Sequence, residues 1–382
     1  MLLIKNGYVK TMAGHDIEKG CVLINDEGKI EKVAAKIAAP KGAKVIDAGG
    51  KLVTPGCVDA HCHIGMLDSA MRWEGDDVNE IVDPVTPQLR AIDGIYVYDE
   101  AFPQALTGGV TSAVTGPGSA NVLGGTFVAI KTYGNSIDKM IIKDPVAMKC
   151  AFGENPKGCY GQKGKSPMTR MAVASMLRET LFKTKRYMQD KADGKDPAFD
   201  MKLEAMIPVL EGKIPLKAHA HRADDILTSI RVAKEFGVKI TLDHCTEGHL
   251  IVDELVEEGW PCFVGPTFGG KSKIELSNKT FDTPRILNEA GLTISIITDA
   301  PVIPLEYLPM CAGLAVNAGL KEEEAWKAIT INPANSTGIG DRVGSLEPGK
   351  DGDVVIWTGN PMRELGAMAE TTIIEGKVVY QR

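Results

Sequence analysis

Alternating or wholly apolar segments of strand length lie near both ends of the chain, at residues 2–4, 21–24, 29–33, 353–357, 371–374 and 377–380. Asn25–Gly28 between two of them is typical of a β-hairpin turn. An isolated hairpin is only marginally stable in water. The pattern therefore predicts that the two ends of the chain pair into one small β-domain.

Between these ends, apolar and β-branched segments alternate with helical patterns. The predicted strands are residues 57–63, 110–115, 127–131, 147–154, 216–221, 238–244, 261–264 and 293–299. Helical spacing of apolar residues predicts helices at 168–189 and 224–236. Residues 65–90 show no clear period and many charges, so we expect a long loop after the first strand. Alternating strands and helices indicate a parallel sheet, and eight strands can close a barrel.

The predicted fold is therefore an α/β protein with two units. Residues 55–344 would form a (β/α)8 TIM barrel. Residues 1–54 and 345–382 would together form a discontinuous β-sandwich. In such a barrel, functional groups gather at the C-terminal ends of the strands, and the long 65–90 loop would lie over that mouth.

Composition narrows the protein class. Of the 382 residues, 44% are hydrophobic and 24% charged, with a formal net charge of -7. This mild acidity argues against nucleic acid and anionic membranes as partners. The apolar stretches are far shorter than the roughly 20 residues of a membrane-spanning helix. The short apolar start is unlike a signal peptide, and the eight cysteines lack metal-ligand spacing. These features predict a cytoplasmic protein with reduced thiols.

Two histidines, His61 and His63, end the first predicted barrel strand in the sequence Asp59-Ala60-His61-Cys62-His63. Residues two apart on a strand share a face, so the two imidazoles would lie side by side. Two imidazoles at the C-terminal end of a barrel strand are well placed to bind a divalent metal. For this pair alone, two buried histidines with ordinary hydrogen bonds are an equally good interpretation.

Three further predicted strands end in the same kind of residue. His219 and His221 end the fifth strand, His244 ends the sixth and Asp299 ends the eighth. Histidines that merely fill a core have no reason to gather at one end of successive strands. Ligands that converge on a metal do, so these residues are candidate metal ligands.

The segment Pro55–His63 resembles the first barrel strand of the amidohydrolase superfamily, and residues 331–353 resemble its return from the barrel to the β-domain. Asp83–Pro87 and Gly116–Asn121 look most like the imidazolonepropionase-related branch, and the His-Ala-His of the fifth strand also occurs in prolidase-like members. The resemblance implies a distorted (β/α)8 barrel that binds one or two divalent metals and hydrolyses amide or other C–N bonds. Zn would be favoured by imidazole-rich ligation, with Mn or Fe allowed.

Position by position, the resemblance implies that His61, His63, His219 and His244 hold metal. Asp299 would both coordinate metal and move a proton from bound water to the leaving nitrogen. His221 would face the substrate, stabilise an oxyanion or act as an acid or base. Either His219 or His221 could be the fifth-strand ligand.

A two-metal site in this superfamily also needs a bridging anion, which is a carbamylated lysine, a glutamate or a cysteine. Glu154 lies at a strand end before a turn and is the first candidate. Lys131 is the second, either carbamylated or bound to a substrate carboxylate. Lys149 has the opposite strand parity to Glu154 and lies five residues deeper, so it is predicted to be poorly placed.

Candidate substrate contacts are Lys131, Arg222 and Arg72. Arg222 stands three residues after His219, where imidazolonepropionases and cytosine deaminases carry Glu. This departure argues against imidazolonepropionate or a cytosine-like ring as substrate.

The sequence thus favours a metal-dependent hydrolase that opens a C–N bond of a small cyclic amide or amidine by a metal-activated hydroxide. A prolidase-like dipeptidase of the same superfamily is the second interpretation. The third, from another class, is an inactive oligomeric scaffold, which the filled ligand positions argue against. The expected partners are a small-molecule substrate and further copies of the chain.

Overall fold

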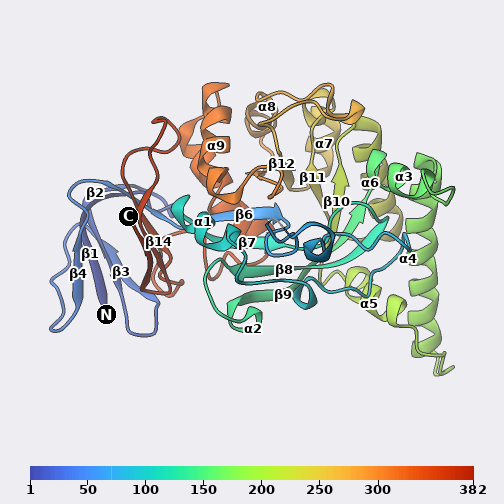
Figure 1. Ribbon diagram of the computed structural model, residues 1–382, viewed down its shortest axis with the longest axis horizontal. Coiled ribbons are helices and arrows are strands. Elements are labelled where there is room, and N and C mark those ends of the chain that lie inside the picture. Colours follow the sequence, from blue (N-terminus) through green and yellow to red (C-terminus); the bar gives the residue numbers. More distant parts are fainter. Residues whose placement is uncertain (70) are drawn as a thin grey trace.

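The computed structural model describes residues 1–69 and 71–382, and it places a small strand-rich unit beside a larger barrel (Figure 1). Both termini lie in the small unit. Its strands are β1 (Leu2–Val9), β2 (Ile17–Ile24), β3 (Ile30–Ala34), β4 (Lys44–Asp47), β5 (Leu52–Pro55), β14 (Val354–Trp357), β15 (Ala369–Ile374) and β16 (Lys377–Gln381).

These strands confirm that the chain ends pair. They form one hydrogen-bonded sheet in the order β16-β15-β14-β5-β1-β2-β3, with β4 also paired to β1. The two ends of the chain meet where β5 runs antiparallel to β14, with Pro55 opposite Val354. Apolar side chains from both ends share one buried cluster, which includes Ile4, Val22, Val354 and Ile373. Neither end could bury this surface alone.

The barrel consists of eight strands, as predicted. They are β6 (Cys57–Cys62), β7 (Val110–Thr115), β8 (Leu123–Lys131), β9 (Ile141–Ala151), β10 (Leu216–Ala220), β11 (Ile240–His244), β12 (Cys262–Val264) and β13 (Ile294–Ile296), paired in chain order. Two backbone hydrogen bonds connect the first strand with the segment after the last. His63 N donates to Ala300 O (2.7 Å), and Asp299 N donates to His61 O (3.2 Å).

One strand departs from the predicted parallel arrangement, because β8 runs antiparallel to both β7 and β9. The connection from β7 to β8 spans only residues 116–122 and contains no helix. A parallel pair needs a crossover of a dozen or more residues, so this connection can form only a hairpin. The C-terminal end of β8 consequently points away from the barrel mouth.

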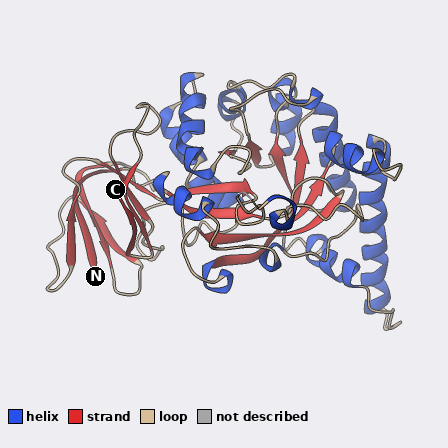
Figure 2. Ribbon diagram, in the orientation of Figure 1, coloured by secondary structure: helices blue, strands red, loops and turns tan. Residues whose placement is uncertain are grey.

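Helices cover the outside of the barrel (Figure 2). They are α1 (Ala101–Thr107), α2 (Ile137–Met140), α3 (Glu154–Gly161), α4 (Arg170–Ala192), α5 (Met201–Leu210), α6 (Ala223–Phe236), α7 (Val252–Glu258), α8 (Thr283–Glu289), α9 (Leu308–Asn317), α10 (Glu322–Ala328) and α11 (Ile331–Ser336).

The two helices predicted from periodicity both form. In α6, Ile226, Ile230 and Ala233 are buried at helical spacing, and the helix ends at Gly237 in the left-handed conformation. The α4 helix starts after Thr169, whose side chain accepts a hydrogen bond from Ala172 N (3.1 Å). Among the described residues, none of the helices combines the length and the apolar character needed to cross a bilayer.

Candidate metal centre

Six of the seven residues predicted as metal ligands or as acid and base groups converge at one end of the barrel, and Glu154 is the exception. His61, His63, His219, His221 and His244 come from β6, β10 and β11 or the residue that follows each strand, and Asp299 follows β13. The histidines are buried, with at most 8% of their surface exposed. His244 and Asp299 both adopt positive φ, at 72° and 55°. Backbone in this region is strained for residues other than glycine, and such strain is concentrated at functional sites.

Four of the five histidines have Nδ1 engaged by a fixed partner. His63 Nδ1 is 2.6 Å from Gly116 O, and His244 Nδ1 is 2.7 Å from Gly265 O. His221 Nδ1 is 2.8 Å from the Thr246 hydroxyl, and His61 Nδ1 contacts the Asp243 carboxylate. A carbonyl or carboxylate partner keeps the proton on Nδ1 and leaves the Nε2 lone pair free to bind a metal.

The remaining ring nitrogens fit a divalent metal. Among the described residues, His244 Nε2 and His219 Nδ1 are buried atoms without a hydrogen-bond partner, and an unsatisfied buried nitrogen costs free energy unless something binds it. Donor atoms of His219, His221 and His244 lie within 4.8 Å of one another, as do those of His61, His244 and Asp299. Imidazole with one carboxylate is a donor set that suits Zn.

Burial also keeps these imidazoles in the neutral form that binds metal. It lowers the pKa of His221 to about 3, and it holds the pKa values of His61, His219 and His244 well below the usual range. A buried imidazolium would have to lose its hydration. The site is therefore ready to accept a cation without first releasing protons near neutral pH.

The Asp299 carboxylate lies close to His61 in β6 and to His63, which directly follows that strand. Its Oδ1 is 3.4 Å from His61 Nε2 and 3.2 Å from His63 Nε2. Burial would raise the pKa of Asp299, but His244, His63 and Lys149 nearby outweigh it, so the pKa lies below its usual value. Asp299 is thus ionised at neutral pH.

The three candidate bridging residues lie in different places. Lys131 is at the end of β8 that points away from the mouth, where its ammonium pairs with Asp351 (2.8 Å) and Asp353 (2.6 Å). The expectation of a metal or substrate role for Lys131 is therefore corrected, and the cause is the antiparallel direction of β8. Glu154 starts α3 and is half-buried. Within the described part of the chain, its carboxylate has no hydrogen bond or ion pair with the histidines.

Lys149 in β9 is the lysine that lies in the site, so the prediction that it is poorly placed is wrong. Its side chain is fully buried, and its Nζ is 3.3 Å from His61 Nε2. The lysine side chain is long enough to reach the histidines from a deeper position in the barrel, which depth along the strand alone does not show. Burial lowers the pKa of Lys149 to about 8, so its neutral, nucleophilic form is accessible at mildly alkaline pH.

The two arginines lie outside the cluster of histidines. Arg222 is the N-cap of α6 and binds Asp224 through two hydrogen bonds, at 3.0 and 3.1 Å. Arg72 begins a short 3-10 turn in the loop after β6 and is exposed. The structure thus brings neither predicted substrate contact to the site.

Glu275 is a site residue that the sequence analysis missed. It lies in the loop between β12 and α8, yet its side chain is fully buried. Its Oε1 is 3.7 Å from His221 Nε2 and 3.9 Å from His219 Nε2, and Lys273 Nζ is 3.1 Å from the same oxygen. The available signal was weak: one acid between Ile274 and Leu276 in a loop rich in glycine and lysine.

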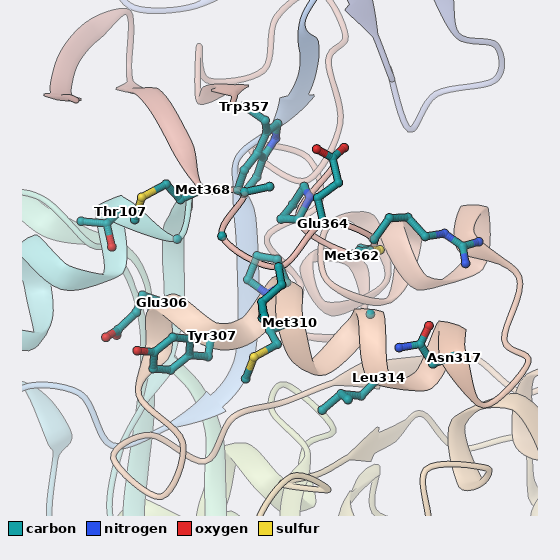
Figure 3. Close-up of a pocket in the computed structure, with 18 residues that line it drawn as sticks. Thr107, Glu306, Tyr307, Met310, Leu314, Asn317, Trp357, Met362, Glu364 and Met368 are labelled. Carbon is teal, nitrogen blue, oxygen red and sulfur yellow. The ribbon is translucent and has the colours of Figure 1, made fainter. Parts of the chain in front are cut away.

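A second hollow is larger but lacks this chemistry. It has a volume of about 460 Å³ and lies between α9, the end of α1 and the segment after β14 (Figure 3). Its lining includes Met310, Leu314, Trp357 and Met362 and is mainly apolar, and the described residues that line it include no histidine. The histidine cluster, and not the larger hollow, is therefore the candidate active site.

Comparisons with known proteins identify relatives of the chain. In sequence, the chain is 30% identical to Amidohydrolase tasK of Hapsidospora irregularis over 94% of its own length, but it spans only 40% of that protein. It is 27% identical to an imidazolonepropionase of Geobacillus kaustophilus, covering 99% of this chain and 91% of the other.

Solved structures show the same relationship. An amidohydrolase structure from Thermotoga maritima matches all of both chains with 42% identity and a TM-score of 0.96. A prolidase structure matches all of both chains with 16% identity and a TM-score of 0.59, which shows a shared fold alone. The model of the amidohydrolase family matches residues 52–379. The chain is therefore a member of the amidohydrolase family.

Proposed function

We propose that the protein is a metal-dependent hydrolase that opens a C–N bond in a small cyclic amide or amidine. The observation that carries this proposal is the buried Nε2 of His244, which has no partner within the described part of the chain and lies among neutral imidazoles and one ionised carboxylate. The imidazolonepropionase relative supports the choice of a small C–N substrate.

His61, His63, His244 and Asp299 would hold one divalent ion, and His219, with His221 as the alternative, would contribute on the β10 side. When bound there, such an ion supplies a Lewis acid and lowers the pKa of coordinated water towards about 7. Lys149 replaces Glu154 and Lys131 as our candidate for the bridging anion of a two-ion site, in its carbamylated form, because its Nζ lies 3.3 Å from His61 Nε2.

Asp299 and His221 would carry the proton and charge movements. The ionised Asp299 carboxylate can accept a proton from the attacking water and deliver it to the departing nitrogen. His221 Nε2, which lies 3.7 Å from Glu275 Oε1, would be the nitrogen that contacts and stabilises a substrate oxygen. The burial of the histidines would limit the access of bulk water during the reaction.

A substrate screen of cyclic ureides, lactams and amidines tests the proposal, with wild type compared with Asp299→Asn. We expect hydrolysis by wild type that requires added Zn or Mn, and a loss of at least 100-fold in kcat for Asp299→Asn. Wild-type rates in Asp299→Asn would overturn the proton-transfer role. The inactive scaffold remains the alternative if protein purified without chelator holds no metal.

A dipeptidase is the second candidate, and Lys273 favours it. Its ammonium lies at the mouth, 2.8 Å from Asn155 Oδ1 and 3.1 Å from Glu275 Oε1. A cation here could hold the carboxylate of a dipeptide. Dipeptides in the same screen distinguish the two functions, because Lys273→Met would raise KM for dipeptides and leave KM for neutral lactams unchanged.

A further inference from the structure

A second lysine, Lys217, is buried beneath the histidines in β10. Only 1% of its surface is exposed. Its ammonium donates to Ala60 O (2.8 Å) and to Asp243 Oδ2 (2.7 Å), and it also lies over the Phe263 ring, 4.4 Å from the ring centre. Lys217 is two residues before His219, so it points into the same barrel interior one layer below.

Asp243 connects this lysine to a predicted metal ligand. Its Oδ2 accepts a hydrogen bond from the Lys217 ammonium and also contacts His61 Nδ1. Its Oδ1 accepts a hydrogen bond from the Thr241 hydroxyl (2.7 Å). The carboxylate is completely buried. Every contact that holds it comes from a fixed strand, so the carboxylate has little freedom to turn away from His61.

The three residues tie together three strands that carry the site. Ala60 and His61 belong to β6, Lys217 to β10 and Asp243 to β11. A buried ion pair gives little net stability compared with apolar side chains of similar size. A methionine or leucine would fill the space under the site at lower cost, so packing alone does not account for Lys217. The need to hold His61 in one orientation does account for this lysine.

We propose that Lys217 and Asp243 are positioning residues that fix the ring and tautomer of His61, with the proton on Nδ1 and Nε2 presented to the metal. Lys217 holds the Asp243 carboxylate in place and balances its charge, and Asp243 holds the imidazole. The inference rests on the proposed function only in taking His61 as a metal ligand.

The test compares the metal affinity of Lys217→Met and Asp243→Asn with that of wild type, by chelator competition with Zn2+ and by the visible spectrum of the Co2+ form. Loss of a partner that orients a ligand typically weakens metal affinity 10–100-fold. We expect a change in that range for both variants and an altered Co2+ spectrum, because His61 would no longer be held in one orientation.

Lys131→Met is the matched control. Lys131 is also a buried lysine with two oxygen partners, but it lies at the opposite end of the barrel. We expect it to lower the thermal unfolding temperature and to leave metal affinity within twofold of wild type. If all three variants weaken metal binding equally, Lys217 is merely structural and the proposal fails.

A measurement on the metal-free protein keeps the inference separate from the function. The 15N NMR signals of His61, assigned by their loss in His61→Gln, should show the proton on Nδ1 in wild type and a mixture of tautomers in Asp243→Asn. A mixture already present in wild type would overturn the inference. If wild type shows the expected tautomer and metal affinity but hydrolyses no substrate, the proposed function fails and the inference stands. Should Lys217→Met not fold, Asp243→Asn, which keeps the side-chain shape, decides the result.

Discussion

Among the residues of the site, His244 has a special position because it belongs to both groups of potential metal donors. One group contains His219 and His221, and the other contains His61 and Asp299. Its Nδ1 is fixed by Gly265 O, and its Nε2 has no partner among the residues that the structure describes. A single side chain thus links the two halves of the candidate metal centre.

We therefore predict that His244→Ala lowers the metal content per chain more than His221→Ala does. The first change removes a donor from both groups, and the second removes a donor from one. Elemental analysis after dialysis against metal-free buffer measures the difference. His249→Ala is the control, since His249 contacts the Thr283 hydroxyl and belongs to neither group. Equal metal content in His244→Ala and wild type would contradict the prediction.

The lowered pKa values predict how the stability of the metal-free protein depends on pH. Burial lowers the pKa of His221 from 6.5 to about 3. Between these values the unfolded chain binds a proton that the folded chain does not, so the free energy of unfolding falls as pH falls below about 6.5. Each such group contributes up to about 1.4 kcal/mol per pH unit.

Urea unfolding of metal-free protein at pH 7.5, 6.5 and 5.5 measures this slope. We expect His221→Gln to reduce the slope by about one proton's contribution and His15→Gln, at an exposed position, to leave it unchanged. Identical slopes in wild type and His221→Gln would show that folding does not keep His221 neutral.

For individual residues, the sequence predicted a place near the site whenever the residue ends a strand. His61, His63, His219, His221, His244 and Asp299 were found because strand ends define one face of a barrel. The position of Lys149 was predicted wrongly, and Lys217 and Asp243 were missed, because their roles depend on how far a side chain extends inside the barrel. Glu275 was missed because nothing in a loop sequence shows that one of its side chains turns inward.

At the scale of elements, the loop between β12 and α8 is held over the site through Glu275. Glu275 Oε2 accepts a hydrogen bond from Glu154 N (3.0 Å) at the start of α3. The Glu275 carboxylate lies next to Gly153. A Cβ atom at this position would be 2.8 Å from Glu275 Oε2 and 2.9 Å from Asp225 Oδ2. Gly153 also has a φ of 81°. Both the conformation and the space at this position require glycine.

Gly153→Ala is therefore predicted to lower stability by about 1–3 kcal/mol and to displace Glu275 from the histidines. Limited proteolysis within residues 265–282 should become faster. Gly158→Ala, within α3 and with open space around its Cβ position, should be neutral or stabilising by about 0.5–1 kcal/mol. Unchanged proteolysis in Gly153→Ala would show that Glu275 does not hold the loop.

Strand positions were predicted better than strand directions. All eight barrel strands lie close to the predicted ranges, since apolar and β-branched runs mark them. The reversal of β8 was missed although residues 116–122 are too few for a crossover. The antiparallel direction of β8 determines where Lys131 lies, because it puts the C-terminal end of this strand on the side of the β-domain and not at the barrel mouth.

At the scale of the whole molecule, a buried ion cluster joins the barrel to the small unit. Lys131 of the barrel pairs with Asp351 and Asp353 beside β14. Asp353 Oδ1 also accepts from Glu375 N (3.0 Å). All three side chains of the cluster are buried. The pairing of the chain ends could be predicted from the sequence, but this connection could not, since it depends on the direction of β8.

Asp353→Ala should lower the free energy of unfolding by about 3–5 kcal/mol, because it leaves a buried ammonium with one fewer counter-charge. Lys51→Ala is the control. It removes the exposed Lys51–Glu370 pair, which also joins the two chain ends, and should cost less than about 1 kcal/mol. Urea unfolding followed by tryptophan fluorescence compares them. Equal costs for the two variants would show that the buried cluster does not stabilise the junction.

The pairing of β5 with β14 also has a consequence for folding during synthesis, because the two strands are synthesised at different times. Pro55 meets Val354, so β5 leaves the ribosome well before its partner exists. At roughly 5–20 residues per second, that interval is on the order of 15–60 s. During this interval, the buried apolar cluster of the small unit lacks the side chains that the C-terminal end contributes, such as Val354 and Ile373. The nascent protein must therefore complete most of its barrel before its first strands can be sheltered.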